Sequence, residues 1–302
     1  MIINRDTLSS SPEDYLRNQG YQAIVWIGEG GPVEDEHQLI ITPEEISRAA
    51  GGNYGLSQII TEQDLPDSIL YCWHGINDYE NLRRFLDSSV QWGEVDVRVD
   101  PESGELISRH DSLARSPRFS NEEFLTLRES LVRFKKNDRG VKVDLKMGGA
   151  VVAETLKLLK SLGFSAEEVW FHADIQVIGI RGFNSLVTTY PYAMVQTTID
   201  PLAPFIAGVP PFGKWMLRFA RHWGVNRFLQ TWKSRYRVRV LERMERWGLP
   251  VNLYQIPDLE EFLKAVLLLP SSITTDFNFP EWGYYGRGSG QNLQWHEYPD
   301  HC

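Results

Sequence analysis

Two acidic side chains, Glu94 and Asp96, stand two positions apart in a stretch whose alternate residues are valines. Because side chains on a strand alternate between its two faces, the pattern predicts a strand over 92–99 that carries both carboxylates on one face. At about 3.3 Å of rise per residue, their Cα atoms lie roughly 6.6 Å apart. Two carboxylates at this spacing indicate a site for a shared hard cation, Mg²⁺ or Ca²⁺.

Other titratable side chains are expected to reach the same place. A Gly-containing turn at 102–104 and a short apolar run return the chain to His110 and Asp111, which can donate or accept protons near the cation. Polar residues also gather near the C-terminal ends of other predicted strands, and these are His74, Asn77, Asp144, Lys146, His172, Asp174, Gln196 and Gln255. The sequence therefore predicts one shared polar site with Glu94, Asp96 and Asp144 as its metal ligands.

The elements that position these residues alternate along the chain from Pro66 onward. Strands are predicted at 69–74, 92–99, 141–146, 169–175, 193–200, 251–255 and 273–278. Helices are predicted at 78–88, 121–136, 150–162, 236–247 and 259–268. Residues 201–233 have no clear period, so the sixth strand is not placed within them.

This alternation predicts an α/β fold, a (β/α)8 TIM-type barrel over 66–302 with an N-terminal α/β extension over 1–65. An open doubly wound sheet would also alternate, but its buried strands should be apolar on both faces, and these strands are not. The barrel segment is close to the roughly 250 residues that such a fold usually has. Polar residues at the strand ends fit the mouth at which barrel enzymes carry their active sites.

The charge distribution and composition of the chain indicate which kinds of partner it could bind. The chain has 302 residues and a net charge of −9, but residues 1–68 hold twelve acids against three arginines, whereas 214–246 hold ten Lys and Arg against two Glu. The basic segment predicts recruitment of an anionic partner such as RNA or a membrane surface; docking of the acidic N-terminus or an ordinary outer helix are the alternatives. No apolar run approaches the ~18 residues that a membrane span needs. The N-terminus also lacks an apolar signal segment, so we expect a cytoplasmic protein.

Four short segments give the chain a resemblance to a known family. They are Trp73-His74 followed by Asn77, Glu94-Val95-Asp96-Val97, His110-Asp111, and Lys142-Val143-Asp144-Leu145-Lys146. In this order and spacing they resemble the glycerophosphodiester phosphodiesterase-like barrels, a superfamily that includes phospholipase C-type enzymes, and within it the menorin-like family. Residues 248–255 and 273–276 resemble the last two β/α units of that superfamily. In those phosphodiesterases an arginine usually follows the first-strand histidine, whereas Gly75 follows His74 here.

The resemblance implies a metal-dependent phosphodiesterase that acts on a glycerophosphodiester or a lysophospholipid-type substrate. Lys146 and the cation would neutralise the phosphate, and His74 and His110 would exchange protons with the substrate. The residues expected to contact the substrate or support the site are Asn77, His172, Asp174, Gln196 and Gln255. Two alternatives stay open: the same chemistry on RNA, with the 2′-hydroxyl as internal nucleophile, and a non-catalytic barrel that binds a phosphate ligand.

Overall fold

The computed structural model describes residues 66, 68–118, 122–256, 259–275, 284–287 and 294–297. The predicted extension over 1–65 lies outside these residues. Within them, no helix combines the length and the apolar character needed to cross a membrane.

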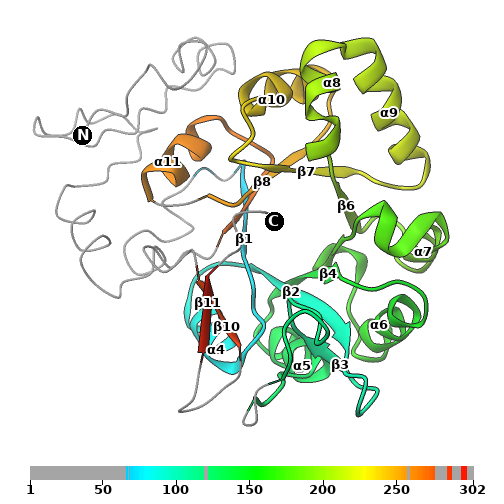
Figure 1. The fold of residues 1–302 in the computed structure, drawn as a ribbon, viewed down its shortest axis with the longest axis vertical. Helices are drawn as coiled ribbons and strands as arrows, with labels where there is room; N and C mark the ends of the chain where they lie inside the picture. The colour runs from blue at the N-terminus through cyan, green and yellow to red at the C-terminus, as the bar shows by residue number, and fades with distance from the viewer. Residues whose placement is uncertain are drawn as a thin grey trace, which may run out of the picture.

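Eight parallel strands close into a barrel, and helices surround it (Figure 1). Neighbouring strands pair in the order β1, β2, β4, β5, β6, β7, β8, β9 and back to β1, while the short β3 pairs antiparallel with β2. The strands are β1 (Leu70–Trp73), β2 (Trp92–Val99), β3 (Leu106–Ser108), β4 (Gly140–Leu145), β5 (Val169–His172), β6 (Met194–Thr198), β7 (Arg227–Thr231), β8 (Val251–Tyr254) and β9 (Ser272–Thr275). The predicted TIM-type barrel is therefore confirmed.

The helices lie between successive strands of the barrel. They are α4 (Tyr79–Asp87), α5 (Leu127–Lys136), α6 (Ala150–Ser161), α7 (Ile175–Thr189), α8 (Ala203–Gly208), α9 (Pro210–His222), α10 (Arg237–Arg246) and α11 (Leu259–Leu267). A separate antiparallel pair joins β10 (Tyr284–Arg287) to β11 (Gln294–Glu297).

The alternation on β2 and β4 places their apolar and polar residues on opposite faces. The valines at 95, 97, 141 and 143 are buried in the same core as Phe85 of α4 and Phe134 of α5, whose ring centroids are 5.0 Å apart. The pairing register sets Asp96 beside Asp144. Since side chains of paired residues point to the same face, both carboxylates face the barrel interior.

Indole rings fill the barrel interior. Trp92 and Trp170 meet edge to face with their ring centroids 6.1 Å apart. The cationic groups of Lys142 and Arg227 each lie 5.0 Å from the Trp170 ring centroid. Since Lys142 and Trp170 precede Asp144 and His172 by two residues on their strands, this layer lies beneath the polar residues at the C-terminal ends.

Several predicted boundaries are wrong, and each has a local cause. The helix predicted over 121–136 begins at Leu127, because Thr126 caps it and forms a capping box with Glu129. The strand predicted to reach Ile175 ends at His172, and Ile175 is the first residue of α7. The unplaced sixth strand is β7, which follows α8 and α9 inside the segment without a clear period.

Candidate functional site

Three buried carboxylates form the centre of the barrel mouth. Glu94 and Asp96 come from β2 and Asp144 from β4, and one oxygen of each lies within 4.8 Å of the other two. The i, i+2 spacing on β2 and the register between Asp96 and Asp144 bring them together. The convergence predicted from the sequence is therefore present in the fold.

Groups on the loop after β1 fix two of the carboxylates. The backbone N–H of Gly75 donates to Glu94 Oε2 at 2.8 Å. Asn77 Nδ2 donates to Asp96 Oδ2 at 2.5 Å, and the backbone N–H of Asp96 donates back to Asn77 Oδ1 at 3.1 Å. These bonds restrict the rotation of both side chains, so each keeps an oxygen directed at its neighbours.

Lys146 bridges the two aspartates. Its Nζ lies 2.8 Å from Asp144 Oδ2 and 3.0 Å from Asp96 Oδ1. Burial alone would lower the pKa of Lys146, but Asp144 and Asp96 more than offset this and hold that pKa well above its usual value. Among the described residues, Glu94 makes no contact with a Lys or Arg side chain at ion-pair distance.

Burial and mutual repulsion act against full ionisation of the cluster. Burial, followed by the charge of Asp96, raises the pKa of Glu94. Burial also opposes ionisation of Asp96 and Asp144, yet the Lys146 ammonium lowers the pKa of both below its usual value. A second positive charge at the cluster would favour the ionised form of all three carboxylates.

The donor set fits a hard divalent cation. All three groups offer carboxylate oxygens, which Mg²⁺ and Ca²⁺ prefer over nitrogen or sulfur ligands. Opposite oxygens around one Ca²⁺ stand about 5 Å apart, since each lies about 2.3–2.6 Å from the ion. The oxygens of Glu94, Asp96 and Asp144, each within 4.8 Å of the others, fall inside that limit.

Two histidines border the carboxylates. His74 follows β1, and its Nε2 lies 3.7 Å from Glu94 Oε2. His110 follows β3; its Nδ1 lies 3.1 Å from Asp111 Oδ1, and its carbonyl accepts a hydrogen bond from Arg98 Nε at 2.9 Å. The positive charge of either ring favours the ionised form of Asp96 and so lowers its pKa. Both imidazoles are about one-fifth exposed, which leaves them accessible from the mouth.

The residues expected to contact the substrate divide into two groups. His172 and Gln196 are buried, with the His172 ring 3.9 Å from Asp144 Oδ2 and 3.2 Å from the Gln196 amide. Burial lowers the pKa of His172. Asn77 bonds to Asp96, so Asn77, His172 and Gln196 form one group beside the carboxylate cluster. Asp174 and Gln255 instead lie at the ends of β5 and β8, where Asp174 is exposed and Gln255 accepts a hydrogen bond from Thr231.

Two polar residues of the mouth were missed from the sequence. Arg98 continues the polar face of β2 two residues beyond Asp96, so the same alternation could have identified it. Asp200 follows β6 and accepts hydrogen bonds from Thr231 N at 2.9 Å and Tyr254 Oη at 3.0 Å. The alternation that places Gln196 and Thr198 on the polar face of this strand could also have identified Asp200.

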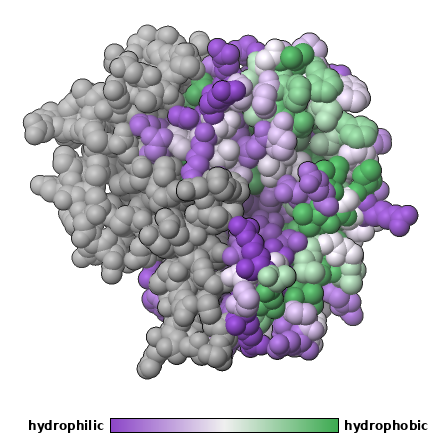
Figure 2. Space-filling view, viewed as in Figure 1, coloured by the Kyte–Doolittle hydropathy of each residue, from purple (hydrophilic) through white to green (hydrophobic). Residues whose placement is uncertain are grey.

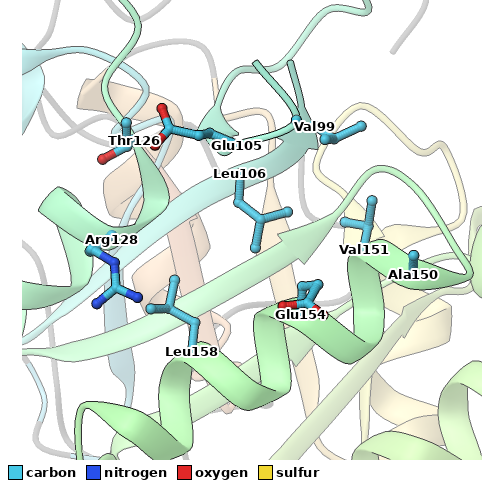
Figure 3. A pocket seen from close by; sticks show the side chains of 10 residues that line it. Val99, Glu105, Leu106, Thr126, Arg128, Ala150, Val151, Glu154 and Leu158 are labelled. Atoms are coloured by element: carbon cyan, nitrogen blue, oxygen red, sulfur yellow. The ribbon is translucent and has the colours of Figure 1, made fainter. Parts of the chain in front are cut away.

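A separate groove of about 400 Å³ lies between β3 and the helices α5 and α6 (Figure 3). Leu106, Thr126, Glu154 and Leu158 are among the side chains that line it. None of the predicted site residues lines this groove, so it is distinct from the carboxylate cluster.

Solved phosphodiesterase structures are similar to this chain in fold. The Oleispira antarctica phosphodiesterase in complex with the product sn-glycerol-3-phosphate is 13% identical, with a TM-score of 0.51 over 72% of this chain and 95% of that chain. A glycerophosphodiester phosphodiesterase from Agrobacterium tumefaciens is 14% identical, with a TM-score of 0.46 over 69% and 96% of the two chains. The first of these likenesses supports the barrel fold.

A family model matches part of the sequence. Residues 68–186 match the model of the menorin N-terminal domain. Over these residues the chain is similar to the menorin family, and the resemblance predicted from its motifs is confirmed. No curated protein matches the chain.

Proposed function

We propose that this protein is a metal-dependent phosphoric diester hydrolase or cyclising phosphodiesterase that acts on a glycerophosphodiester or a lysophospholipid-type substrate. The convergence of Glu94, Asp96 and Asp144 within 4.8 Å, beside two accessible histidines, is the observation that supports it. The similar Oleispira antarctica phosphodiesterase holds sn-glycerol-3-phosphate, a product of the same chemical class.

The role of each residue follows from the position of its side chain. Glu94, Asp96 and Asp144 hold the cation, Mg²⁺ or Ca²⁺, which when bound supplies positive charge to a phosphoryl oxygen. Lys146 supplies a second positive charge at the same place, since its Nζ lies within 3.0 Å of both aspartates.

His74 and His110 carry the proton transfers. One removes the proton from the attacking hydroxyl, and the other protonates the leaving alkoxide. Asp111 Oδ1, 3.1 Å from His110 Nδ1, orients that ring. When the substrate has a hydroxyl next to the phosphate, that hydroxyl is the attacking group and the product is a cyclic phosphate.

Two alternative functions would use the same site. With RNA as substrate, the 2′-hydroxyl would attack in the same way. In a non-catalytic barrel, Lys146 and the cation would bind a phosphate ligand without turnover.

The test is a metal titration combined with a diester screen. Chelated protein should hydrolyse no diester, and Mg²⁺ or Ca²⁺ should restore cleavage of glycerophosphodiesters or lysophospholipids. Asp96→Asn should abolish both metal binding and turnover, while Glu154→Gln, an exposed carboxyl on α6, should change neither. Metal binding without turnover of any diester would indicate the binding barrel, and cleavage of RNA alone would indicate the second alternative.

A further inference from the structure

The helix α9 exposes its largest apolar side chains instead of burying them. Phe212, Trp215 and Phe219 are 42%, 58% and 51% exposed, whereas Gly213 and Leu217 of the same helix are buried. The spacing of three and four residues places the three aromatic side chains on one face. An ordinary barrel helix would turn such a face toward the sheet.

The exposed rings form a continuous row that ends at the partly buried Trp223. Successive ring centroids lie 5.3 Å apart from Phe205 of α8 to Phe212, 5.9 Å to Trp215, 6.2 Å to Phe219 and 4.1 Å to Trp223. We call these five residues the aromatic ridge. Figure 2 shows hydrophobic surface over the region where Figure 1 places α8 and α9. Contiguous apolar surface of this kind marks an interaction site rather than ordinary surface.

The ridge begins at the barrel mouth. Helix α8 starts at Ala203, shortly after Asp200 at the end of β6, and exposes Phe205 and Val209. The neighbouring α7 begins three residues after His172 and exposes Ile175, Val177 and Ile180 in its first turns. Apolar side chains therefore border the mouth beside the proposed catalytic site.

Basic residues outnumber acidic ones in the segment that carries the ridge. From Ile175 to His222 the chain has four basic residues, Arg181, Lys214, Arg218 and Arg221, and its single acid is Asp200. Both Asp200 oxygens accept hydrogen bonds, from Thr231 and Tyr254, so this carboxylate is turned toward the mouth. In a protein with a net charge of −9, this excess of basic residues is a local reversal of charge along the chain.

We propose that the aromatic ridge and its basic flank bind the interface of an anionic lipid bilayer. Aromatic rings are favoured at the boundary between headgroups and acyl chains, and Lys and Arg beside them are attracted to anionic headgroups. A second copy of this chain would bring basic flank against basic flank. A nucleic acid would need free ring faces, but Phe212, Trp215 and Phe219 stack on one another at interplanar angles of 28° and 18°.

This surface deepens the proposed function. A ridge that starts at the mouth would hold the catalytic site beside the headgroup layer, which favours a lipid diester over a freely soluble one. That choice of substrate rests on the proposed function, whereas adsorption to a bilayer does not depend on turnover. The basic segment predicted over 214–246 also includes α10, which packs against α8 through a hydrogen bond from Arg243 Nη1 to the carbonyl of Ile206 at 2.9 Å.

The test is co-sedimentation of the full chain with vesicles of phosphatidylcholine alone or with 30% phosphatidylserine. We expect binding to the anionic vesicles that weakens as salt rises. Trp215→Ala with Phe219→Ala should reduce the partition coefficient at least tenfold, because each exposed ring loses its burial in the interface. Arg218→Gln with Arg221→Gln should reduce it several-fold at low salt and less at high salt.

Matched variants keep this test specific. Tyr192→Ala removes an aromatic residue that is 95% exposed outside the ridge, and Lys157→Gln removes an exposed charge on α6, so neither should change vesicle binding. Thermal unfolding of every variant checks that the fold is kept. Failure of the wild type to bind anionic vesicles would overturn the proposal, as would equal binding by the ridge variants. Dimerisation that depends on Trp215 would assign the ridge to a second copy of this chain. Single-stranded RNA binding that depends on Trp215 would assign it to a nucleic acid.

Discussion

Asn77 and Asp96 exchange two hydrogen bonds, one from the Asn77 amide to Asp96 Oδ2 at 2.5 Å and one from the Asp96 backbone N–H to Asn77 Oδ1 at 3.1 Å. The pair joins the loop after β1 to β2 at the carboxylate cluster. This geometry makes Asn77 a residue that positions Asp96, and its expected contact with the substrate stays a prediction.

The first prediction follows from that pair. Asn77→Ala should weaken divalent metal binding about 10- to 100-fold, because residues that orient a metal ligand typically contribute that much to affinity. Isothermal titration with Ca²⁺ measures the change, and Asn137→Ala at the exposed end of α5 serves as the control. Unchanged affinity in Asn77→Ala would show that Asp96 does not need this partner.

Substitution of Lys146 should change metal affinity and turnover in opposite directions. Its ammonium occupies oxygens of Asp96 and Asp144 that a cation also needs, so Lys146→Gln should raise the affinity for Ca²⁺ by up to about tenfold. Turnover should fall about 10²- to 10³-fold, because a positive charge near the phosphate is lost. Titration and initial rates on the same protein separate the two effects. A loss of both Ca²⁺ affinity and turnover would show that Lys146 does not compete with the cation for these carboxylates.

The same substitution should make stability depend on metal. Without the ammonium, two buried aspartates lose their ion pair, which should destabilise the chelated protein by roughly 3–5 kcal/mol. Ca²⁺ at one hundred times its dissociation constant should return about 2.7 kcal/mol. Chemical denaturation with chelator and with Ca²⁺ measures both values, and a variant that gains nothing from Ca²⁺ would argue against a cation at this cluster.

Asp78, the residue that caps α4, should make folding stability fall as pH rises. Burial raises the pKa of Asp78 from 3.8 to about 6 in the folded state, although hydrogen bonds from Asn81 oppose the shift. Between these values the folded chain binds more protons than the unfolded chain, so this group stabilises the fold as pH decreases through 6. From pH 7 to pH 5 the gain should be about 1 kcal/mol.

Comparison of the wild type with Asp78→Asn isolates this contribution. Asparagine can still cap the helix but does not titrate, so the difference in unfolding free energy between the two proteins should change over pH 5–7. Denaturant unfolding at both pH values gives that difference. If the wild type and Asp78→Asn differ in unfolding free energy by the same amount at pH 5 and pH 7, the folded-state pKa of Asp78 is not raised.

The sequence predicted the barrel and the carboxylate cluster because both follow from short-range periodicity. On β2 and β4 the alternation of valine with charged residues identifies the inner face, and parallel strands align their C-terminal ends. Glu94, Asp96 and Asp144 could therefore be grouped before any coordinates were known. Helix boundaries were less predictable, since Thr126 is one of several possible caps before α5.

The segment from 201 to 233 was unpredictable for a physical reason. Helix prediction assumes that apolar residues face the core, but α9 exposes Phe212, Trp215 and Phe219, so its apolar pattern is not that of a buried face. Prolines at the start of α8 and α9 also interrupt the period. The role of a single residue such as Asn77 could not be predicted either. Its hydrogen bond to Asp96, nineteen positions along the chain, forms only when the barrel closes.

The proton-transfer pair gives the last prediction. His74→Asn and His110→Asn should each lower turnover about 10²- to 10⁴-fold, the usual contribution of a general acid or base. Metal affinity should stay nearly unchanged, because neither imidazole belongs to the carboxylate cluster. The double variant should lose less than the product of the two single losses, since the two groups serve one reaction.

Product analysis completes this test. A substrate with a hydroxyl next to the phosphate, of the glycerol or ribose type, should give a cyclic phosphate, whereas a diester without that hydroxyl should hardly react. His222→Asn, an exposed histidine at the end of α9, is the matched control and should keep the wild-type rate on soluble substrate. Full activity in either His74→Asn or His110→Asn, on a substrate that the wild type cleaves, would rule out this mechanism.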